Sequence, residues 1–240
     1  KFSCQLTASD IQVLANTREF KQRLLTLIAE ARDRIYITAL YLQDDEAGNE
    51  IIQALLEAKS QHPDLDIKVF VDYHRAQRGL IGEKACLGNR ELYLKVNDKK
   101  PDSIGFYGIP VKTKELFGVL HLKGMVFDDK LLYSGASINN VYCHQNDKYL
   151  LDRYHILSSS CLANSFVQFL DSVFVNSNAA FRLDLPSLPT AKQVKISARA
   201  IKRLVRTNPY RLPLEPKQEG DITVEPFVGF GKRGNELNKR

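Results

Sequence analysis

Two helix-like segments alternate with two strand-like segments early in the chain, and this order constrains the fold more than any other feature. Apolar side chains recur at helical spacing in residues 20–30 and 50–59, whereas residues 35–42 and 67–71 are short apolar runs rich in β-branched residues. Pro63 ends the second helical segment, because proline cannot continue a helix. Helices and strands in this order, with short connections, predict an α/β fold whose mixed, largely parallel sheet is flanked by helices.

The middle of the chain shows weaker patterns. Residues 76–110 are richer in Gly, Asn, Asp and Lys, and we expect a loop-rich excursion there. Residues 119–127 and 131–134 resemble strands, and the intervening residues 128–130 suit a tight hairpin. Residues 159–176 carry an apolar stripe at helical spacing, which predicts a further helix.

The composition changes after about Arg182, where prolines become frequent. We therefore expect one domain over residues 1–182 and a proline-containing connector over residues 183–240, which is the start of a missing second half. Residues 191–206 of this connector predict a basic amphipathic helix. Such a helix can lie on an anionic membrane surface or pack on the domain.

The overall composition excludes several classes of protein. A hydrophobic share of 44% argues against disorder, and no apolar run approaches the ~20 residues needed to span a bilayer. The net charge of +6 favours anionic partners such as nucleic acid, phospholipid headgroups or a phosphorylated substrate. We expect no zinc site and no disulfide framework, because the cysteines lie far apart in the sequence and form no CxxC pair. The cysteines are Cys4, Cys86, Cys143 and Cys161. We also expect no cofactor.

The segment His121-Leu-Lys123-Gly-Met-Val-Phe-Asp128 carries the predicted chemistry. Residues i and i+2 of a strand point to the same face, so His121 and Lys123 are expected to project together. A neutral histidine can attack a phosphodiester as a nucleophile, while a lysine offsets the charge on the non-bridging oxygens. Asp128 can orient an imidazole ring or balance the positive charge.

A polar turn follows this segment. Gly135-Ala-Ser137-Ile-Asn139 offers backbone NH, hydroxyl and amide groups, all of which can bind phosphate. A lone His-x-Lys on a strand is usually no more than a polar face. The complete spacing, followed by this turn, is much rarer by chance and indicates a functional site.

The run from His121 to Asn139 resembles the HxKxxxxD motif and the following loop of the phospholipase D superfamily. Other stretches resemble the bacterial phosphatidylserine synthases of that superfamily, and the likeness is close from about residue 20 to residue 155. These stretches are residues 39–48 (ALYLQDDEAG), 72–79 (DYHRAQRG), 132–139 (LYSGASIN) and 144–155 (HQNDKYLLDRYH). The resemblance implies that residues 1–182 form a phospholipase D-like half-domain with one such motif.

The resemblance implies a phosphatidyltransferase that makes phosphatidylserine from CDP-diacylglycerol and L-serine without a metal. The histidine of one motif attacks the β-phosphate, releases CMP and becomes a phosphatidyl-histidine. The histidine of the second motif acts as general acid and then as general base for serine. Carried over by position, His121 is one of these two histidines, Lys123 is a phosphate ligand and Asp128 is the supporting carboxylate.

Further substrate-binding residues also follow from the resemblance. The superfamily loop commonly has serine directly after glycine, where Ala136 stands here, so Ser137 or Asn139 is expected to contact phosphate. Four basic residues either grip the pyrophosphate or cytidine end of the substrate or pair with neighbouring aspartates. They are Arg75, Arg78, Lys148 and Arg153.

This mechanism needs two motifs, and the chain carries one. The second comes either from a missing C-terminal part of the chain or from the mate in a homodimer. The alternatives are a homodimeric nuclease or phosphodiesterase of the same superfamily, which would bind nucleic acid, and a catalytically silent lipid-surface binding module. The synthase interpretation implies a cytoplasmic protein peripherally associated with the inner face of the cytoplasmic membrane.

Overall fold

The computed structural model describes residues 3–78, 88–111, 120, 122–145, 147–207 and 220–226. The helices are α1 (Thr17–Glu30), α2 (Glu46–Gln61), α3 (Arg90–Lys99), α4 (Ser160–Leu170) and α5 (Ala191–Thr207), with short helical turns η1 (Ala8–Asp10), η2 (Arg75–Gln77) and η4 (Asp171–Val175). The strands are β1 (Cys4–Leu6), β2 (Ile11–Leu14), β3 (Arg34–Thr38), β4 (Asp66–Asp72), β5 (Gly105–Ile109), β6 (Gly124–Phe127), β7 (Lys130–Tyr133), β8 (Tyr154–Ser158), β9 (Phe181–Arg182) and β10 (Ile222–Val224).

Eight of these strands form one mixed sheet in the order β2-β8-β7-β6-β3-β4-β5-β9, and β1 pairs separately with β10. Parallel pairing joins β3 to β4 and β4 to β5, with α2 and α3 in the two connections. The strands on either side pair antiparallel. The predicted mixed α/β sheet with flanking helices is confirmed, and its parallel part is the β3–β4–β5 unit.

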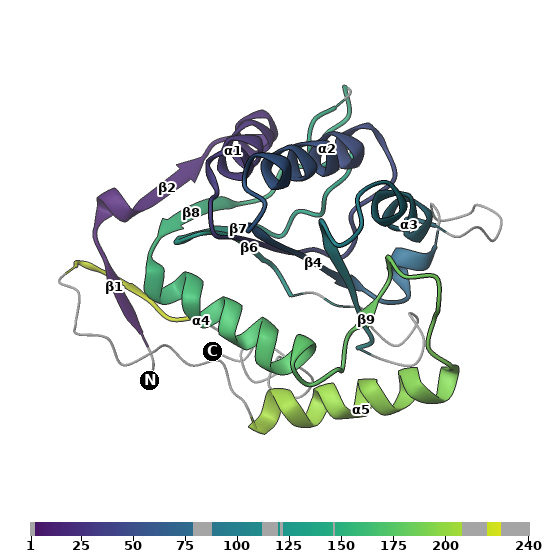
Figure 1. The fold of residues 1–240 in the computed structure, drawn as a ribbon. Helices are drawn as coiled ribbons and strands as arrows, with labels where there is room; N and C mark the ends of the chain where they lie inside the picture. Colours follow the sequence, from purple (N-terminus) through teal and green to yellow (C-terminus); the bar gives the residue numbers. More distant parts are fainter. Residues whose placement is uncertain are drawn as a thin grey trace.

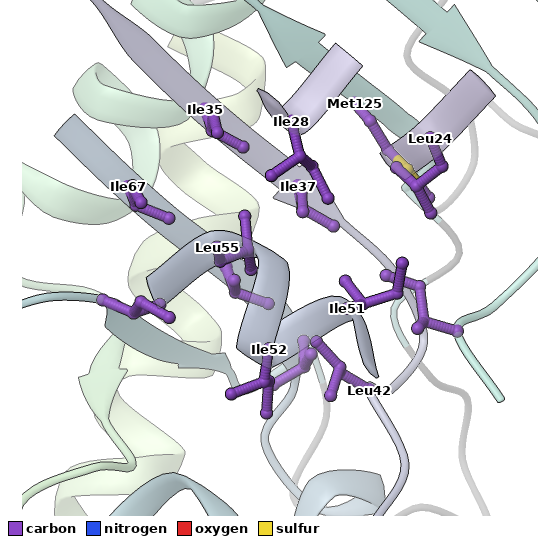
Figure 2. Packing of buried hydrophobic residues seen from close by; sticks show 14 of the residues in the cluster. Leu24, Ile28, Ile35, Ile37, Leu42, Ile51, Ile52, Leu55, Ile67 and Met125 are labelled. Carbon is purple, nitrogen blue, oxygen red and sulfur yellow. The ribbon is translucent and has the colours of Figure 1, made fainter. Parts of the chain in front are cut away.

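Helices cover both faces of this sheet, α1, α2 and α3 on one side and α4 and α5 on the other (Figure 1). Successive residues of β3 serve the two layers in turn, as the period of two in a strand requires. Ile35 and Ile37 pack with Leu24 of α1 and Ile51 of α2 (Figure 2), whereas Tyr36 belongs to the apolar cluster beneath α4. The central strands are therefore buried on both faces.

Side-chain caps explain where the first two helices begin. The Asn16 carboxamide oxygen accepts hydrogen bonds from the backbone N–H groups of Arg18 and Glu19. The Asp45 carboxylate accepts from the N–H of Gly48 in the same way. Both helices consequently start a few residues earlier than their apolar stripes alone predict.

The loop-rich excursion predicted for residues 76–110 is wrong in its second half, which contains α3 and β5. Leu92, Tyr93 and Val96 form the buried stripe of α3, but charged residues around them weaken the helical pattern. Gly105 and Gly108 dilute the apolar run of β5. The parallel β4–β5 pair needs a crossover, and α3 lies within it.

The segment after Arg182 packs on the domain. The apolar stripe of α5 is buried against η4 and α4, so the packed alternative describes this helix and the membrane-lying one does not. Its buried residues are Val194, Ser197, Ala198, Ile201 and Val205. That residues 183–240 begin a second half stays a prediction. In the part of the chain that the structure describes, no helix is long and apolar enough to cross a membrane.

Candidate active site

Lys123 of the predicted catalytic segment directly precedes β6, at the end of that strand that lies beside the carboxyl end of β3. Thr38, the last residue of β3, pairs with Gly124, and its hydroxyl donates a 2.7 Å hydrogen bond to the Gly124 carbonyl. The strand expected over residues 119–127 begins only at Gly124, so strand alternation does not set the direction of Lys123. His121 lies outside the described residues, although its neighbours Leu120 and Leu122 are described.

The Lys123 side chain points toward residues 135–139, called the polar loop below. Its Nζ donates a 3.4 Å hydrogen bond to the Ser137 hydroxyl oxygen, which spans 14 residues of sequence. Burial lowers the pKa of the Lys123 ammonium, and the negative charge of Asp152 partly opposes this shift. A desolvated ammonium with one long hydrogen bond among the described residues can still bind an anion strongly.

The structure separates the two loop residues between which the sequence could not choose. Ser137 is buried, and its hydroxyl meets Lys123. The Asn139 carboxamide is occupied within the protein, because its Nδ2 donates to the Tyr41 hydroxyl at 3.1 Å and its Oδ1 accepts from the Tyr142 N–H at 2.9 Å. Ser137 is therefore the better placed of the two to contact a ligand of Lys123, and Asn139 holds the loop against Tyr41. A phosphate contact by either residue stays a prediction.

Backbone amides of the same loop are partly committed to other groups. The Gly135 N–H donates to Asp152 at 3.1 Å and the Ala136 N–H donates to the Ser134 hydroxyl at 3.0 Å. The Ile138 N–H donates to the Tyr41 carbonyl at 3.4 Å. These bonds hold the loop in place. Because these three N–H groups already donate to protein acceptors, they are not available to bind a phosphate.

The four basic candidates do not all lie alike. Arg75 is half-buried, with its guanidinium carbon 4.8 Å from the centre of the Tyr41 ring, beside the loop. Arg78, Lys148 and Arg153 are exposed. Arg75 is thus the candidate that the structure links to the loop through a described contact, and a substrate-binding role stays a prediction for all four.

Asp128 does not stand beside Lys123 as a supporting carboxylate. It follows the opposite end of β6, about 15 Å further along an extended chain. Its Oδ1 accepts from the N–H groups of Asp33 and Arg34, and its Oδ2 accepts from that of Arg32, all at 2.9–3.0 Å. The prediction for Asp128 is wrong in position, because this carboxylate anchors the chain entering β3 and begins the turn of the confirmed β6–β7 hairpin.

Sequence reasoning missed Asp72, which it treated only as a possible ion-pair partner of Arg75. Asp72 ends β4 and is buried, and its Oδ2 accepts a 2.8 Å hydrogen bond from the N–H of Leu120. Its Oδ1 accepts from the N–H groups of His74 and Arg75 at 2.9 and 2.8 Å. Polar groups that follow the carboxyl ends of parallel strands commonly mark a site, and this signal was available in the sequence.

Taken together, the described groups can hold a phosphorylated ligand. Lys123 and Ser137 supply a cation and a hydroxyl, and Arg75 supplies a second cation nearby. Among the described residues, no group of three or more His, Cys, Asp or Glu side chains is placed to hold a metal ion. The two cations and the hydroxyl can stabilise negative charge on such a ligand.

The chain is similar to several known proteins. The chain is 42% identical to the CDP-diacylglycerol–serine O-phosphatidyltransferase of Haemophilus influenzae over 98% of its length, and 38% identical to PssA, the enzyme of that name from Escherichia coli, over 97%. The crystal structure of the Haemophilus influenzae phosphatidylserine synthase superposes with a TM-score of 0.83 at 41% identity, covering 91% of this chain. The match takes in 52%, 51% and 49% of those proteins, so this chain spans about half their length.

The family itself is defined by a further match. Residues 24–143 fit the family described as the phospholipase D-like domain of cardiolipin synthase. This range begins in α1 and includes Lys123, Ser137 and Asn139. The chain therefore belongs to the phospholipase D-like domain family.

Proposed function

We propose that this chain supplies one half of the active site of a CDP-diacylglycerol–serine O-phosphatidyltransferase. The contact between Lys123 and Ser137 carries the proposal, because it sets a half-buried ammonium and a hydroxyl next to the segment that contains His121. The relatives of that name cover nearly the whole of this chain, which supports the choice of reaction.

In the proposed reaction, an imidazole nitrogen attacks the β-phosphorus of CDP-diacylglycerol. The bond from this phosphorus to the bridging anhydride oxygen breaks, and CMP leaves with a proton from the second histidine. The serine hydroxyl then attacks the phosphorus while that second histidine accepts its proton. The phosphorus–nitrogen bond breaks, which yields phosphatidylserine and regenerates the first imidazole.

Within this scheme, the residues of this chain stabilise charge. The Lys123 ammonium and the Ser137 hydroxyl bind the non-bridging oxygens, whose negative charge is held where little water competes. Arg75 supports the pyrophosphate end, which a guanidinium can bind through two parallel hydrogen bonds. His121 is one of the two histidines, and the structure does not assign it as the nucleophile or as the general acid and base.

The second histidine must come from outside this chain. His62, His74, His144 and His155 are each followed two residues later by something other than lysine. The ring of His144 instead shares a 2.9 Å hydrogen bond with the Thr17 hydroxyl. We place the second motif in the remaining part of a longer chain, since the relatives are about twice as long. A homodimer mate is the other source.

The lipid substrate requires contact with a membrane, which we place on the cytoplasmic side. Because the apolar stripe of α5 is buried, another surface must make this contact. Tyr149, Leu150 and Leu151 are consecutive and 50%, 51% and 63% exposed. The Leu150 N–H donates to the Val141 carbonyl, which ties this apolar segment close to the polar loop. We assign the segment to the interface of an anionic bilayer.

A tryptophan probe tests this membrane contact. Leu150→Trp in the full-length protein should shift to shorter emission wavelengths when vesicles containing anionic phospholipid are added. Ile196→Trp, at an exposed apolar position of α5, is the matched control and should not shift. Emission from Leu150→Trp that is already blue-shifted without vesicles would mean that other parts of the protein cover the segment.

The activity is tested by measuring CMP release from CDP-diacylglycerol in mixed micelles, with the uninterrupted natural reading frame. Release that depends on L-serine and is lost in His121→Ala supports the synthase. Cleavage of single-stranded DNA without CMP release would instead support the nuclease. Vesicle binding that persists in His121→Ala, with no turnover by the wild type, would indicate a lipid-surface binding module.

A further inference from the structure

A buried carboxylate outside the proposed chemistry connects two segments of the site. Asp72 is 1% exposed, and both of its oxygens are used. One oxygen accepts hydrogen bonds from the N–H groups of Arg75, the first residue of η2, and of His74, which directly precedes it. The other accepts the N–H of Leu120, which is 48 residues away in sequence and directly precedes His121.

The position demands a carboxylate. Burial raises the pKa of Asp72, and the backbone hydrogen bonds from Arg75 and Leu120 oppose that shift. An asparagine has only one oxygen, so its NH₂ group would face either the Leu120 N–H or the two N–H groups of η2, donor against donor. A buried donor without an acceptor destabilises whichever segment it faces. An apolar residue would leave all three N–H groups without this acceptor.

Both connected segments lead to groups of the site. The Arg75 guanidinium lies over the Tyr41 ring, and the Tyr41 hydroxyl accepts a hydrogen bond from Asn139 of the polar loop. On the other side, Leu120 directly precedes His121 in the sequence, and Lys123 follows two residues later. Displacing either segment by about 1 Å is enough to reduce a rate by about a hundredfold when two groups must act on one phosphorus.

We propose that Asp72 is a positioning residue that sets the distance between Arg75 and Leu120, the residue that directly precedes His121 in the sequence. It touches no substrate in this account and acts through the three N–H groups that it accepts. The proposal rests on the proposed function for its kinetic consequence, but the mechanical link between the two segments can be measured without any activity.

The test compares Asp72→Asn with Asp171→Asn in the full-length protein. Asp171 is the matched control, because it is a half-buried carboxylate whose pKa burial also raises, and it lies with Tyr36 and Lys68 far from the site. Amide hydrogen exchange is followed in the peptides that contain Leu120 and Arg75. In parallel, kcat and KM for CDP-diacylglycerol are measured from serine-dependent CMP release, at a temperature where both variants are folded.

We expect Asp72→Asn to speed exchange in the peptide whose N–H groups its NH₂ group faces, and to lower kcat by ten- to a hundredfold, with KM changed by no more than about twofold. Asp171→Asn should leave both peptides and kcat unchanged. Unaltered exchange in the two peptides, or faster exchange with a wild-type kcat, would overturn the positioning role. A wild type that releases no CMP would contradict the proposed function, while the exchange result would still decide whether Asp72 links the two segments.

Discussion

The two ends of β6 both carry charged residues of one sequence motif, but they differ in how those charges are satisfied. At its start, the Lys123 ammonium has a single 3.4 Å hydrogen bond among the described residues and a pKa lowered by burial. At its far end, the Asp128 carboxylate accepts three short backbone hydrogen bonds. One end is prepared to bind something else, and the other is complete without a ligand.

The neighbouring strands repeat this contrast. Near the start of β3 and β4, Lys68 pairs with Asp66 and Asp171, and the Tyr36 hydroxyl donates to Asp66. These ions neutralise one another beneath η4. Residues of one motif can therefore lie at opposite ends of a strand, so spacing within a motif does not place all of its members in one site.

The largest effect is expected at the start of β6. Lys123→Ala should lower kcat/KM for serine-dependent CMP release by about 10²–10³-fold, because it removes charge stabilisation from the phosphoryl group. Steady-state kinetics on the full-length protein measure this. Lys130→Ala is the matched control, since Lys130 pairs with Glu30 at the other end of the hairpin and should keep its activity. Equal losses in both variants would remove the distinction between the two ends.

A loss of stability is expected at the far end. Asp128→Ala should lower the free energy of unfolding by about 3 kcal/mol, because three N–H groups lose a charged acceptor and alanine fits poorly at a φ of 50°. Asp128→Asn should lose roughly half as much, since asparagine tolerates this φ and keeps one oxygen. Urea unfolding measures both. If Asp128→Ala were as stable as the wild type but had a reduced kcat, Asp128 would have to contribute to the reaction instead.

A smaller loss is expected at the start of β3. Tyr36→Phe removes the hydroxyl that donates to Asp66 and Asp171, which should cost about 1 kcal/mol of unfolding free energy. The rate of CMP release should not change. Denaturant titration and the enzyme assay together check this, and a reduced rate in a stable variant would show that this end also contributes to function.

The smallest effect concerns pH. Burial lowers the pKa of Lys123 in the folded state from its usual 10.5, so holding the charged form costs stability. That cost is complete below the lowered pKa and disappears as pH rises toward 10.5, because the unfolded chain then binds more protons than the folded one. Lys123→Met should therefore be more stable than wild type at pH 7, by under about 1 kcal/mol.

This advantage should shrink as pH approaches 10. Urea unfolding at pH 7 and pH 9.5 measures the difference, with Lys130→Met as the reference variant. If the advantage of Lys123→Met grew with pH, the ammonium would have to be stabilised by the fold rather than strained by it.

The main elements of the fold followed from apolar periodicity, because α1, α2, β3 and β4 are buried enough for their patterns to be clear. The short antiparallel strands β2 and β8 escaped notice. β2 has only four residues, two of them exposed, and β8 has five residues that begin at the end of the charged stretch 144–155. Strands at the edge of a sheet depend on tertiary pairing more than on local sequence.

The site was predictable in its residue types and less so in its geometry. The segment from His121 to Lys123 and the loop with Ser137 came from spacing, and the structure brings Lys123 and Ser137 together. Asp128 lies away from Lys123, whereas Asp72 lies beside the predicted site, and this difference depends on which backbone N–H groups surround each carboxylate. Those groups come from residues 32–34 in one case and from Leu120 in the other, far away in sequence.

The proposed reaction depends most on a covalent phosphatidyl-histidine intermediate. The direct measurement is exchange of labelled CMP into CDP-diacylglycerol by the full-length protein in the absence of serine, in wild type and in His121→Ala. We expect the wild type to exchange labelled CMP into CDP-diacylglycerol and His121→Ala not to do so. The covalent intermediate forms before serine enters, and both histidines are needed to form it. Phosphatidylserine synthesis without any exchange, or exchange that survives in His121→Ala, would contradict the proposed reaction.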